Sequence, residues 1–371
     1  MLVYKVLVFG MTENPGGVES VIINYYRAID KKKFQFDFLC NSYEKVAYED
    51  ELIAGGGKTI HFPARSQNIV EYKKQLEKFF KEHAEEYQAI WVNVCSLANI
   101  DYLKLAKKYG IKKRIIHSHN SQNMDSKMRG ILHEVNKKNI EKYATDFWAC
   151  SYEAADWFFK PSLKEKVVQI HNAINISKLI FDNSKRNKYR NELKWNDKFV
   201  IGNIGRLHYQ KNQQFLLDLF KKIEVVLPEA RLVLIGQGED EAVLKEKVSS
   251  LGLDEKVYFA GVQYDIGGWL SAFDVFIFPS LFEGLPLVSL EAQANGVPML
   301  ASEEAVPEEG RINSNFICLQ LSKGVDVWVE KIIELKENKQ RISSELIQAN
   351  FSSIGYDIET EVKRLEELFL R

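Results

Sequence analysis

One unit of secondary structure is predicted twice in this chain, and it restricts the fold more than any other feature of the sequence. A short apolar strand at 6–9 leads into a glycine-containing turn and an amphipathic helix at 20–29. A second strand, glycine turn and helix begin at residue 199. Such a unit starts a doubly wound parallel sheet, whose ligands bind at the carboxyl edge of the strands. The repeat therefore predicts two α/β domains.

Further strands and helices alternate along both halves, as parallel sheets with helices on both faces require. The polar, basic stretch 182–197 has no apolar period and is expected to be a linker between the domains. The expected strands lie at 36–39, 89–95, 114–118, 146–151 and 167–170, then at 199–204, 231–235, 257–261, 275–278, 298–301 and 316–319, and the expected helices include 70–83, 97–109, 124–143 and 358–370.

Composition narrows the class of protein and its compartment. The chain is 46% hydrophobic and 27% charged, which is typical of a globular protein with substantial cores. Its four cysteines are far apart and form no C-x-x-C pair, which argues against a zinc site or a disulfide framework. The amino-terminal apolar run is short and lacks a cleavage pattern, and no apolar stretch approaches the roughly 18–20 residues of a membrane span. These features predict a cytoplasmic protein.

The net charge of −1 conceals an asymmetry between the halves. Residues 1–180 hold 27 Lys and Arg against 21 Asp and Glu, and the remainder holds 23 against 30. A basic half, with an expected amphipathic helix at 124–143, favours peripheral contact with an anionic membrane. Two alternatives stay open: drift of surface charge, and a helix that frames an acceptor groove or is simply solvated.

The stretch 274–292 carries the most specific motif. Its apolar start at 275–278 predicts a buried strand, and Pro286 is suited to the first position of the following helix. The amides of that helix start, beside flexible Gly284, are expected to hold an anionic oxygen. Glu283 precedes the helix and Glu291 lies within it, so two carboxylates are placed to accept hydroxyls from different parts of one ligand.

Two further turns carry candidate site residues. After the strand at 199–204, Gly205 and Asn212 enclose Arg206 and Lys211, whose charges suit a diphosphate approaching the glycine backbone. The first helix is preceded by a weaker motif, Gly16-Gly17-Val18-Glu19. A later Gly236-Gln-Gly238 follows a second strand rather than a first and lacks the third glycine, so a dinucleotide site is excluded.

A pair of histidines closes the strand at 114–118. Period-two alternation places His117 and His119 on one face, with His119 nearer the sheet edge. The alternative is a structural pair satisfied by backbone carbonyls. Metal ligation is disfavoured, because no neighbouring Cys or carboxylate completes a ligand set.

The E-G-x-P-x(4)-E motif at 283–291 and the G-R-x(4)-K-N motif at 205–212 resemble those of family 4 retaining glycosyltransferases, and the resemblance extends over nearly the whole chain. It implies the GT-B fold, α/β, with two Rossmann-like doubly wound domains facing a central cleft. It also implies an acceptor-side domain at 1–180, onto which a terminal helix at 356–371 packs back, and a nucleotide-sugar domain at 181–355.

The resemblance also implies roles for individual residues. Glu283 and His119 would face the donor sugar, Arg206 and Lys211 the diphosphate, and Glu291 the ribose. The implied catalytic residues are His119, Arg206, Lys211 and Glu283, and the implied donor-binding residues are Gly16, Gly17, Gly205, Asn212, Val262, Gln263, Gly284, Leu285, Pro286, Leu287 and Glu291.

The resemblance predicts transfer of a sugar, with retention, from a nucleotide-sugar, with UDP favoured, to a glycan or polyprenyl-linked acceptor in exopolysaccharide or capsule synthesis. The chain has no D-x-D triplet, so we expect no metal; no cofactor and no nucleic acid partner are expected either. Two alternatives remain, a nucleotide-sugar 2-epimerase of the same fold and a noncatalytic partner subunit. The conjunction of Arg206, Lys211, Glu283 and Glu291 counts against the latter.

Overall fold

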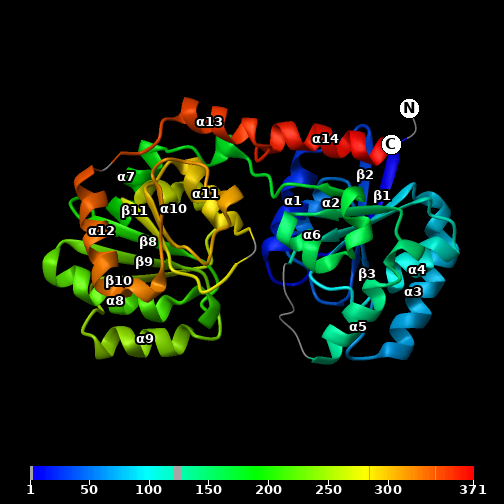
Figure 1. Cartoon of the computed structure of the whole chain (residues 1–371), viewed down its shortest axis with the longest axis horizontal. Helices are drawn as coiled ribbons and strands as arrows, with labels where there is room; N and C mark the ends of the chain where they lie inside the picture. Colours follow the sequence, from blue (N-terminus) through cyan, green and yellow to red (C-terminus); the bar gives the residue numbers. More distant parts are fainter. Residues whose placement is uncertain (1–2, 121–126, 284, 339) are drawn as a thin grey trace. The chain divides into compact units, whose positions relative to one another are not determined.

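The computed structural model describes residues 3–120, 127–283, 285–338 and 340–371. The chain divides into two compact units, of which unit 1 comprises Met1–Ala173 and Ile358–Arg371 and unit 2 comprises Ile174–Asp357. Each unit contains one parallel sheet with helices packed on it (Figure 1). The expectation of two doubly wound α/β units is therefore confirmed.

Unit 1 is built on a sheet of order β3-β2-β1-β4-β5-β6-β7, in which every pair is parallel. The order reverses between β1 and β4, which makes this the topological switch point where such sheets bind ligands. The strands are β1 (Tyr4–Phe9), β2 (Phe34–Cys40), β3 (Thr59–His61), β4 (Ala89–Val94), β5 (Lys113–Ser118), β6 (Asp146–Ala149) and β7 (Val167–Gln169). The helices are α1 (Gly17–Ala28), α2 (Glu49–Ala54), α3 (Ile69–His83), α4 (Asp101–Lys108), α5 (Lys127–Lys137), α6 (Tyr152–Phe158) and α14 (Ile358–Leu370).

Helix α14 belongs to unit 1 because its apolar face is buried there. Phe369 packs its ring within 6.0 Å of the rings of Phe34 and Trp91, measured between centroids. The buried Glu361 carboxylate lies 3.2 Å from His171 Nδ1, and this ion pair fixes the helix beside the end of the first segment. These contacts explain why a helix remote in sequence completes the unit.

Unit 2 repeats the design with the order β10-β9-β8-β11-β12-β13, again entirely parallel. Its switch point lies between β8 and β11. The strands are β8 (Phe199–Ile204), β9 (Ala230–Ile235), β10 (Val257–Gly261), β11 (Val275–Phe278), β12 (Met299–Ser302) and β13 (Phe316–Leu319). The helices are α7 (Asn183–Glu192), α8 (Gln213–Val226), α9 (Glu241–Ser250), α10 (Ile266–Ala272), α11 (Leu287–Asn295), α12 (Gly324–Asn338) and α13 (Ser344–Ser353).

The expected linker at 182–197 is wrong, since most of it forms helix α7. Asp182 caps the helix by accepting hydrogen bonds from the backbone at 184 and 185. Arg186 and Arg190 both reach the Asp274 carboxylate, at 2.6 and 2.5 Å. This helix docks through guanidinium groups rather than an apolar stripe, so a search for apolar periodicity overlooks it.

Two expected helices in unit 1 are shorter than their patterns indicated. The prediction 97–109 becomes α4, which begins at Asp101, because the backbone amide of Leu97 instead donates to His133 Nδ1 at 3.1 Å. The prediction 124–143 becomes α5 and a separate 3-10 turn at Ile140–Lys142; its first three residues lie outside the described part. Helix ends set by side-chain contacts are not visible in periodicity.

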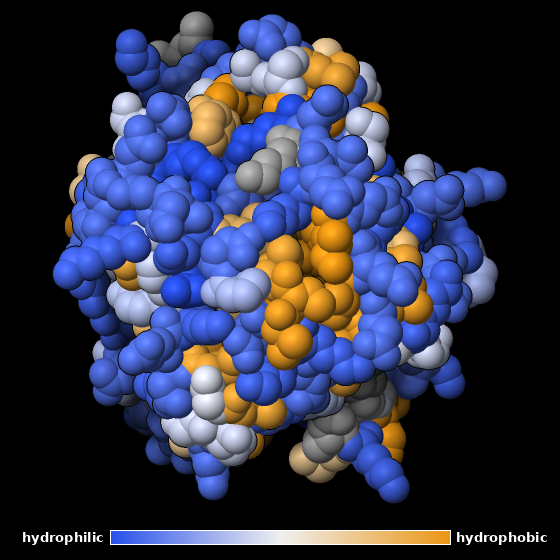
Figure 2. All heavy atoms as spheres, turned by 90° about the vertical axis from the view of Figure 1, so that its left-hand side faces the viewer, coloured by the Kyte–Doolittle hydropathy of each residue, from blue (hydrophilic) through white to orange (hydrophobic). Residues whose placement is uncertain are grey.

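The surface is polar over most of its area. The face shown in Figure 2 is mainly hydrophilic, with hydrophobic side chains gathered in a patch near its centre. Among the described residues, no helix combines the length and the apolar character needed to cross a bilayer.

Candidate active site

In unit 2, the two sequence motifs meet at the switch point of the sheet. The loop after β8 and the loop after β11 lie side by side because these strands are neighbours. The backbone amide of Leu281 donates to the Gln210 carbonyl at 2.8 Å, and Gln210 Nε2 donates to the Phe282 carbonyl at 2.8 Å. Gln210 therefore joins the cation turn to the loop that carries Glu283, a role that no sequence signal suggested.

Asn212 begins helix α8 in a left-handed backbone conformation, with φ 56° and ψ 40°. Asparagine tolerates this region better than most residues, because its short polar side chain bonds locally. Its Nδ2 donates to the Pro279 carbonyl at 3.1 Å, which adds a third link between the loops. In the ligand-free protein Asn212 thus shapes the site.

Lys211 and Glu283 form a direct ion pair, with Nζ 2.6 Å from Oε1. Both side chains are largely buried, at 18% and 10% exposure. Lys211 Nζ also lies 5.2 Å from the centroid of the Phe278 ring, a cation–π geometry. The structure therefore brings together two residues that the sequence placed 72 positions apart.

Arg206 occupies a more open position on the same turn. Its guanidinium lies 3.0 Å from the Glu239 carboxylate, and the side chain is 67% exposed. His208 Nε2 approaches the same carboxylate at 3.3 Å. Glu239 was not among the expected site residues, although it directly follows the glycine pair at 236–238.

That glycine pair has a packing function. A Cβ atom at Gly236 would lie 2.1 Å from the Gly205 carbonyl oxygen, and one at Gly238 would lie 2.2 Å from the Leu207 carbonyl oxygen. Gly236 also has a φ of +131°, which L residues rarely adopt. The glycines at 236 and 238 therefore let this loop pack against the cation turn, which accounts for them without a dinucleotide.

Helix α11 starts one residue later than expected. Pro286 is the N-cap, with φ −73° and ψ 117°, and Leu287 is the first helical residue. Leu285 and Pro286 are buried, and Leu287 is partly buried. Gly284 lies outside the described residues, so its expected contact with an anion stays a prediction.

Glu291 lies on α11, one turn inside the helix, as expected. Its side chain is partly buried, and this burial raises the pKa of the carboxyl to about 7. Because the cause is loss of solvation, hydrogen-bond donors from a ligand would restore the charged form. Glu291 is therefore poised between protonation states near neutral pH.

The two residues expected at the nucleotide base follow β10. Val262 is 39% exposed. Gln263 is already engaged, since its Nε2 donates to the Ala260 carbonyl at 2.6 Å and its Oε1 accepts from Trp269 Nε1 at 3.1 Å. Any contact of Gln263 with a base would therefore come from its backbone unless these bonds break.

In unit 1, His119 lies just beyond β5, and Asn93 on β4 holds it. His119 Nε2 is 2.9 Å from Asn93 Oδ1, while Asn93 Nδ2 donates to the Phe9 carbonyl at 3.2 Å and so fixes the orientation of the amide. Burial lowers the pKa of His119 to about 3, so the ring is neutral. With the amide oxygen accepting from Nε2–H, Nδ1 is left as an acceptor. Sequence reasoning missed Asn93, although it ends the strand paired with β5.

His117 lies deeper and is fully buried, as its position on the strand predicted. Its Nδ1 lies 3.1 Å from Asn93 Oδ1 and 3.3 Å from Trp91 Nε1, and its ring stacks on that indole. Burial, followed by the neighbouring His119, lowers the pKa of His117 well below its usual value. Its surroundings are those of a core residue.

The glycine loop of unit 1 is closed by its own glutamate. Gly16 is the N-cap of α1 and Gly17 its first residue. Glu19 accepts from the Gly16 amide at 3.1 Å and from Thr12 Oγ1 at 2.5 Å, a capping-box arrangement. A Cβ at Gly16 would lie 2.8 Å from Glu19 Oε2, whereas one at Gly17 meets nothing within 4 Å. The glutamate of this motif thus shapes the loop in the ligand-free protein.

The described residues contain no group of three His, Cys, Asp or Glu side chains arranged to hold a metal ion.

Two doubly wound parallel sheets, each with glycine loops and polar residues at its switch point, define a protein of the GT-B class. The solved structure of HepE from Anabaena in complex with UDP and glucose superposes with a TM-score of 0.80, at 19% identity and over 99% of both chains. The GT-B fold is thereby confirmed.

Residues 185–352 match the family model described as "Glycosyl transferases group 1". The chain is 29% identical over 366 residues to the putative glycosyltransferase EpsF of Bacillus subtilis (strain 168), covering 96% of this chain and 94% of the relative. It is also 28% identical over 184 residues to the UDP-Gal:alpha-D-GlcNAc-diphosphoundecaprenol alpha-1,3-galactosyltransferase of Escherichia coli, covering 46% and 45%. The chain belongs to the group 1 glycosyltransferases.

Proposed function

We propose that the protein transfers a sugar, with retention and without a metal ion, from a UDP-sugar to a glycan or polyprenyl-linked acceptor in polysaccharide biosynthesis. One observation carries the proposal: Lys211 and Glu283, from two motifs, meet at the switch point of unit 2. A cation suits the donor diphosphate, and a carboxylate beside it suits the sugar hydroxyls. HepE was solved with UDP and glucose, and the Escherichia coli relative uses UDP-Gal and a diphosphoundecaprenol-linked acceptor by name.

In the proposed reaction the bond between the anomeric carbon and the diphosphate oxygen breaks, and the acceptor oxygen attacks from the same face. The acceptor proton passes to the departing phosphate oxygen, so atoms and charge balance. Arg206 and Lys211 stabilise the negative charge that grows on the diphosphate. In the ligand-free protein both cations are paired with carboxylates, Glu239 and Glu283, so donor phosphate exchanges for carboxylate as it binds.

We assign His119 to positioning of the donor sugar rather than to proton transfer. A ring with a pKa of about 3 is a poor proton donor at neutral pH. Its Nδ1, left as an acceptor by the contact of Nε2 with Asn93, suits a sugar hydroxyl. We assign Glu291 to the ribose, and the loops at 16–17, 262–263 and 284–287 to the remaining donor contacts.

The test is turnover of UDP-, GDP- and ADP-sugars with and without a lipid-linked or glycan acceptor. We expect the UDP-sugar to stabilise the protein against heat, by about 2.7 kcal/mol at 100 times Kd. UDP release should require acceptor, survive chelator, and yield a product with the donor's anomeric configuration by NMR. Sugar isomerisation without acceptor would identify an epimerase instead, and UDP binding without turnover under any condition would identify a noncatalytic subunit.

We further propose a cytoplasmic location with peripheral attachment to an anionic membrane through the basic first half of the chain. The residues that would make this contact are derived next.

A further inference from the structure

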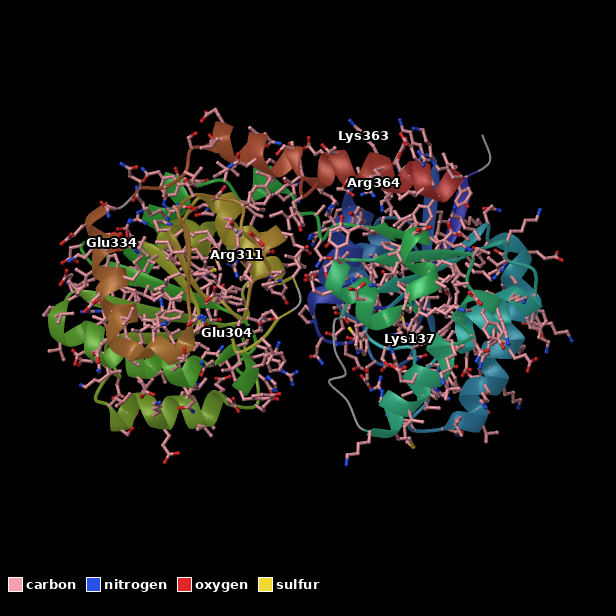
Figure 3. The ribbon with its side chains drawn as sticks, in the orientation of Figure 1. Lys137, Glu304, Arg311, Glu334, Lys363 and Arg364 are labelled. Carbon is pink, nitrogen blue, oxygen red and sulfur yellow. The ribbon has the colours of Figure 1, made fainter. Side chains whose placement is uncertain are left out.

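Helix α5 docks on unit 1 through one side only. His133 is buried, accepts from the Leu97 amide and stacks its ring on Trp157, with centroids 4.2 Å apart. Asn136 Nδ2 donates to the Leu97 carbonyl at 2.7 Å, and Lys137 Nζ donates to the Trp157 carbonyl at 2.5 Å. Residues 133, 136 and 137 lie on one face of a helix, so this face is the attached one. Figure 3 labels Lys137 at this junction.

The opposite face of α5 is apolar and exposed. Its four side chains are spaced i, i+3, i+4 and i+7, which places them in one row along the helix. We call this row the α5 stripe: Met128 (69% exposed), Ile131 (65%), Leu132 (37%) and Val135 (52%). Single exposed apolar residues are ordinary on protein surfaces, whereas a contiguous row indicates a surface that is covered in function.

The surroundings of the α5 stripe are basic. Lys127 and Lys138 are exposed and, three helical turns apart, lie on the same flank of the stripe. Residues 104–142 contain 11 Lys and Arg but only 3 Asp and Glu. Within this segment Lys107 Nζ donates to the Lys142 carbonyl, so the lysines of α4 lie beside the end of the α5 region. The occupant of the stripe is therefore expected to be apolar at its centre and negative around it.

We propose that α5 lies in the interface of an anionic phospholipid membrane, with Met128, Ile131, Leu132 and Val135 among the acyl chains and Lys127 and Lys138 at the headgroups. An amphipathic helix with an aliphatic face and lysines on its flanks has the composition of an interfacial helix. An acidic soluble protein would match the lysines but would not require four aliphatic side chains in a row. The inference goes beyond the proposed transfer reaction, because it holds for membrane binding without a donor.

The first test is sedimentation of the full-length protein with vesicles of phosphatidylcholine alone or with phosphatidylglycerol at 30 mol%. We expect binding only to the anionic vesicles, weakening as salt is raised. Ile131→Gln with Val135→Gln should weaken binding by roughly 10-fold or more, because two aliphatic side chains no longer enter the acyl region. The matched control is Val225→Gln with Val226→Gln on α8, whose residues are 70% and 51% exposed and should leave binding unchanged.

The second test separates charge from apolar insertion. Lys127→Gln with Lys138→Gln should weaken binding to anionic vesicles by roughly 10- to 30-fold, at about fivefold for each cation near the surface. The control is Lys188→Gln with Lys363→Gln, of which Lys363 is labelled on α14 (Figure 3). Within unit 1, α14 and α5 lie at opposite ends of the view in Figure 1, so Lys363 should not reach the same membrane surface.

The alternative occupants give distinct results. If Ile131→Gln with Val135→Gln converts a dimer to a monomer in analytical ultracentrifugation and leaves vesicle binding intact, the α5 stripe is an interface between copies and the membrane proposal is wrong. If the variant raises KM for a water-soluble acceptor and still sediments with vesicles, the stripe is an acceptor groove and the proposal is equally wrong. Vesicle binding requires no UDP-sugar, so failure of the transfer reaction would not affect this test.

Discussion

Replacing Glu291 with glutamine should make unit 2 more stable, and only above acidic pH. Burial raises the pKa of this carboxyl from about 4.5 to about 7, so the folded protein holds its proton more tightly than the unfolded chain does. Below about pH 4.5 both states are protonated and the wild type loses nothing. As pH rises to about 7 the wild type progressively loses stability relative to a neutral side chain, and above that the difference is constant.

The magnitude follows from the shift. A difference of about 2.5 pKa units corresponds to roughly 3 kcal/mol, and partial exposure of the side chain reduces this to about 1–3 kcal/mol. For a unit of this size, Glu291→Gln should raise Tm by roughly 2–12 °C at pH 8 and by almost nothing at pH 4.5. The assay is thermal unfolding of both proteins from pH 4.5 to 8.5, with Glu246→Gln, an exposed glutamate on α9, as the control.

The same residue should couple UDP binding to protons. Ribose hydroxyls that donate to the Glu291 carboxylate favour its charged form and lower its pKa, so UDP affinity should rise with pH through about 7. A shift of one to two units gives roughly a 10- to 100-fold change in affinity. UDP itself titrates near this range, so the measured quantity is the difference between wild type and Glu291→Gln in titration calorimetry.

Two outcomes would refute this reasoning. A stability difference that is the same at every pH would show that Glu291 is solvated like a surface carboxylate. An identical pH dependence of UDP affinity in wild type and Glu291→Gln would remove Glu291 from the ribose, and with it the role carried over at the strongest motif.

The other predictions concern the cations and the histidine pair. Arg206→Ala should lower kcat by roughly 100- to 1000-fold through loss of a transition-state donor, and an unchanged rate would exclude Arg206 from the diphosphate. Glu239→Gln should tighten UDP binding by up to about fivefold at low salt, since an exposed pair with Arg206 is worth at most about 1 kcal/mol; weaker binding would contradict the exchange of carboxylate for phosphate. His119→Ala and Asn93→Ala should each lower kcat by roughly 10- to 100-fold, while His117→Ala should mainly lower Tm; steady-state rates and thermal unfolding of the three variants decide this, and loss of turnover in His117→Ala alone would reverse the assignment.

The main features of the fold could be predicted from the sequence because they depend on local patterns. Buried parallel strands are continuous apolar runs, and the glycine turns at 10–17 and 205 mark where each sheet begins. Helix α7 could not be found in this way, because Arg186 and Arg190 attach it through a carboxylate that lies more than 80 residues away. The three-residue strand β3 is too short for its pattern to be distinguished from a turn.

The site divides in the same way. The sequence alone determined which residue types stand at the ends of which strands, and so indicated Arg206, Lys211, Glu283 and Glu291 before any coordinates. Only the tertiary structure decided which groups meet. Pairing of β8 with β11 brings Lys211 to Glu283, and pairing of β4 with β5 brings Asn93 to His119. Strand order is a long-range property that spacing along the chain does not contain, and burial, which sets the pKa values of Glu291 and His119, exists only once the sheets are packed.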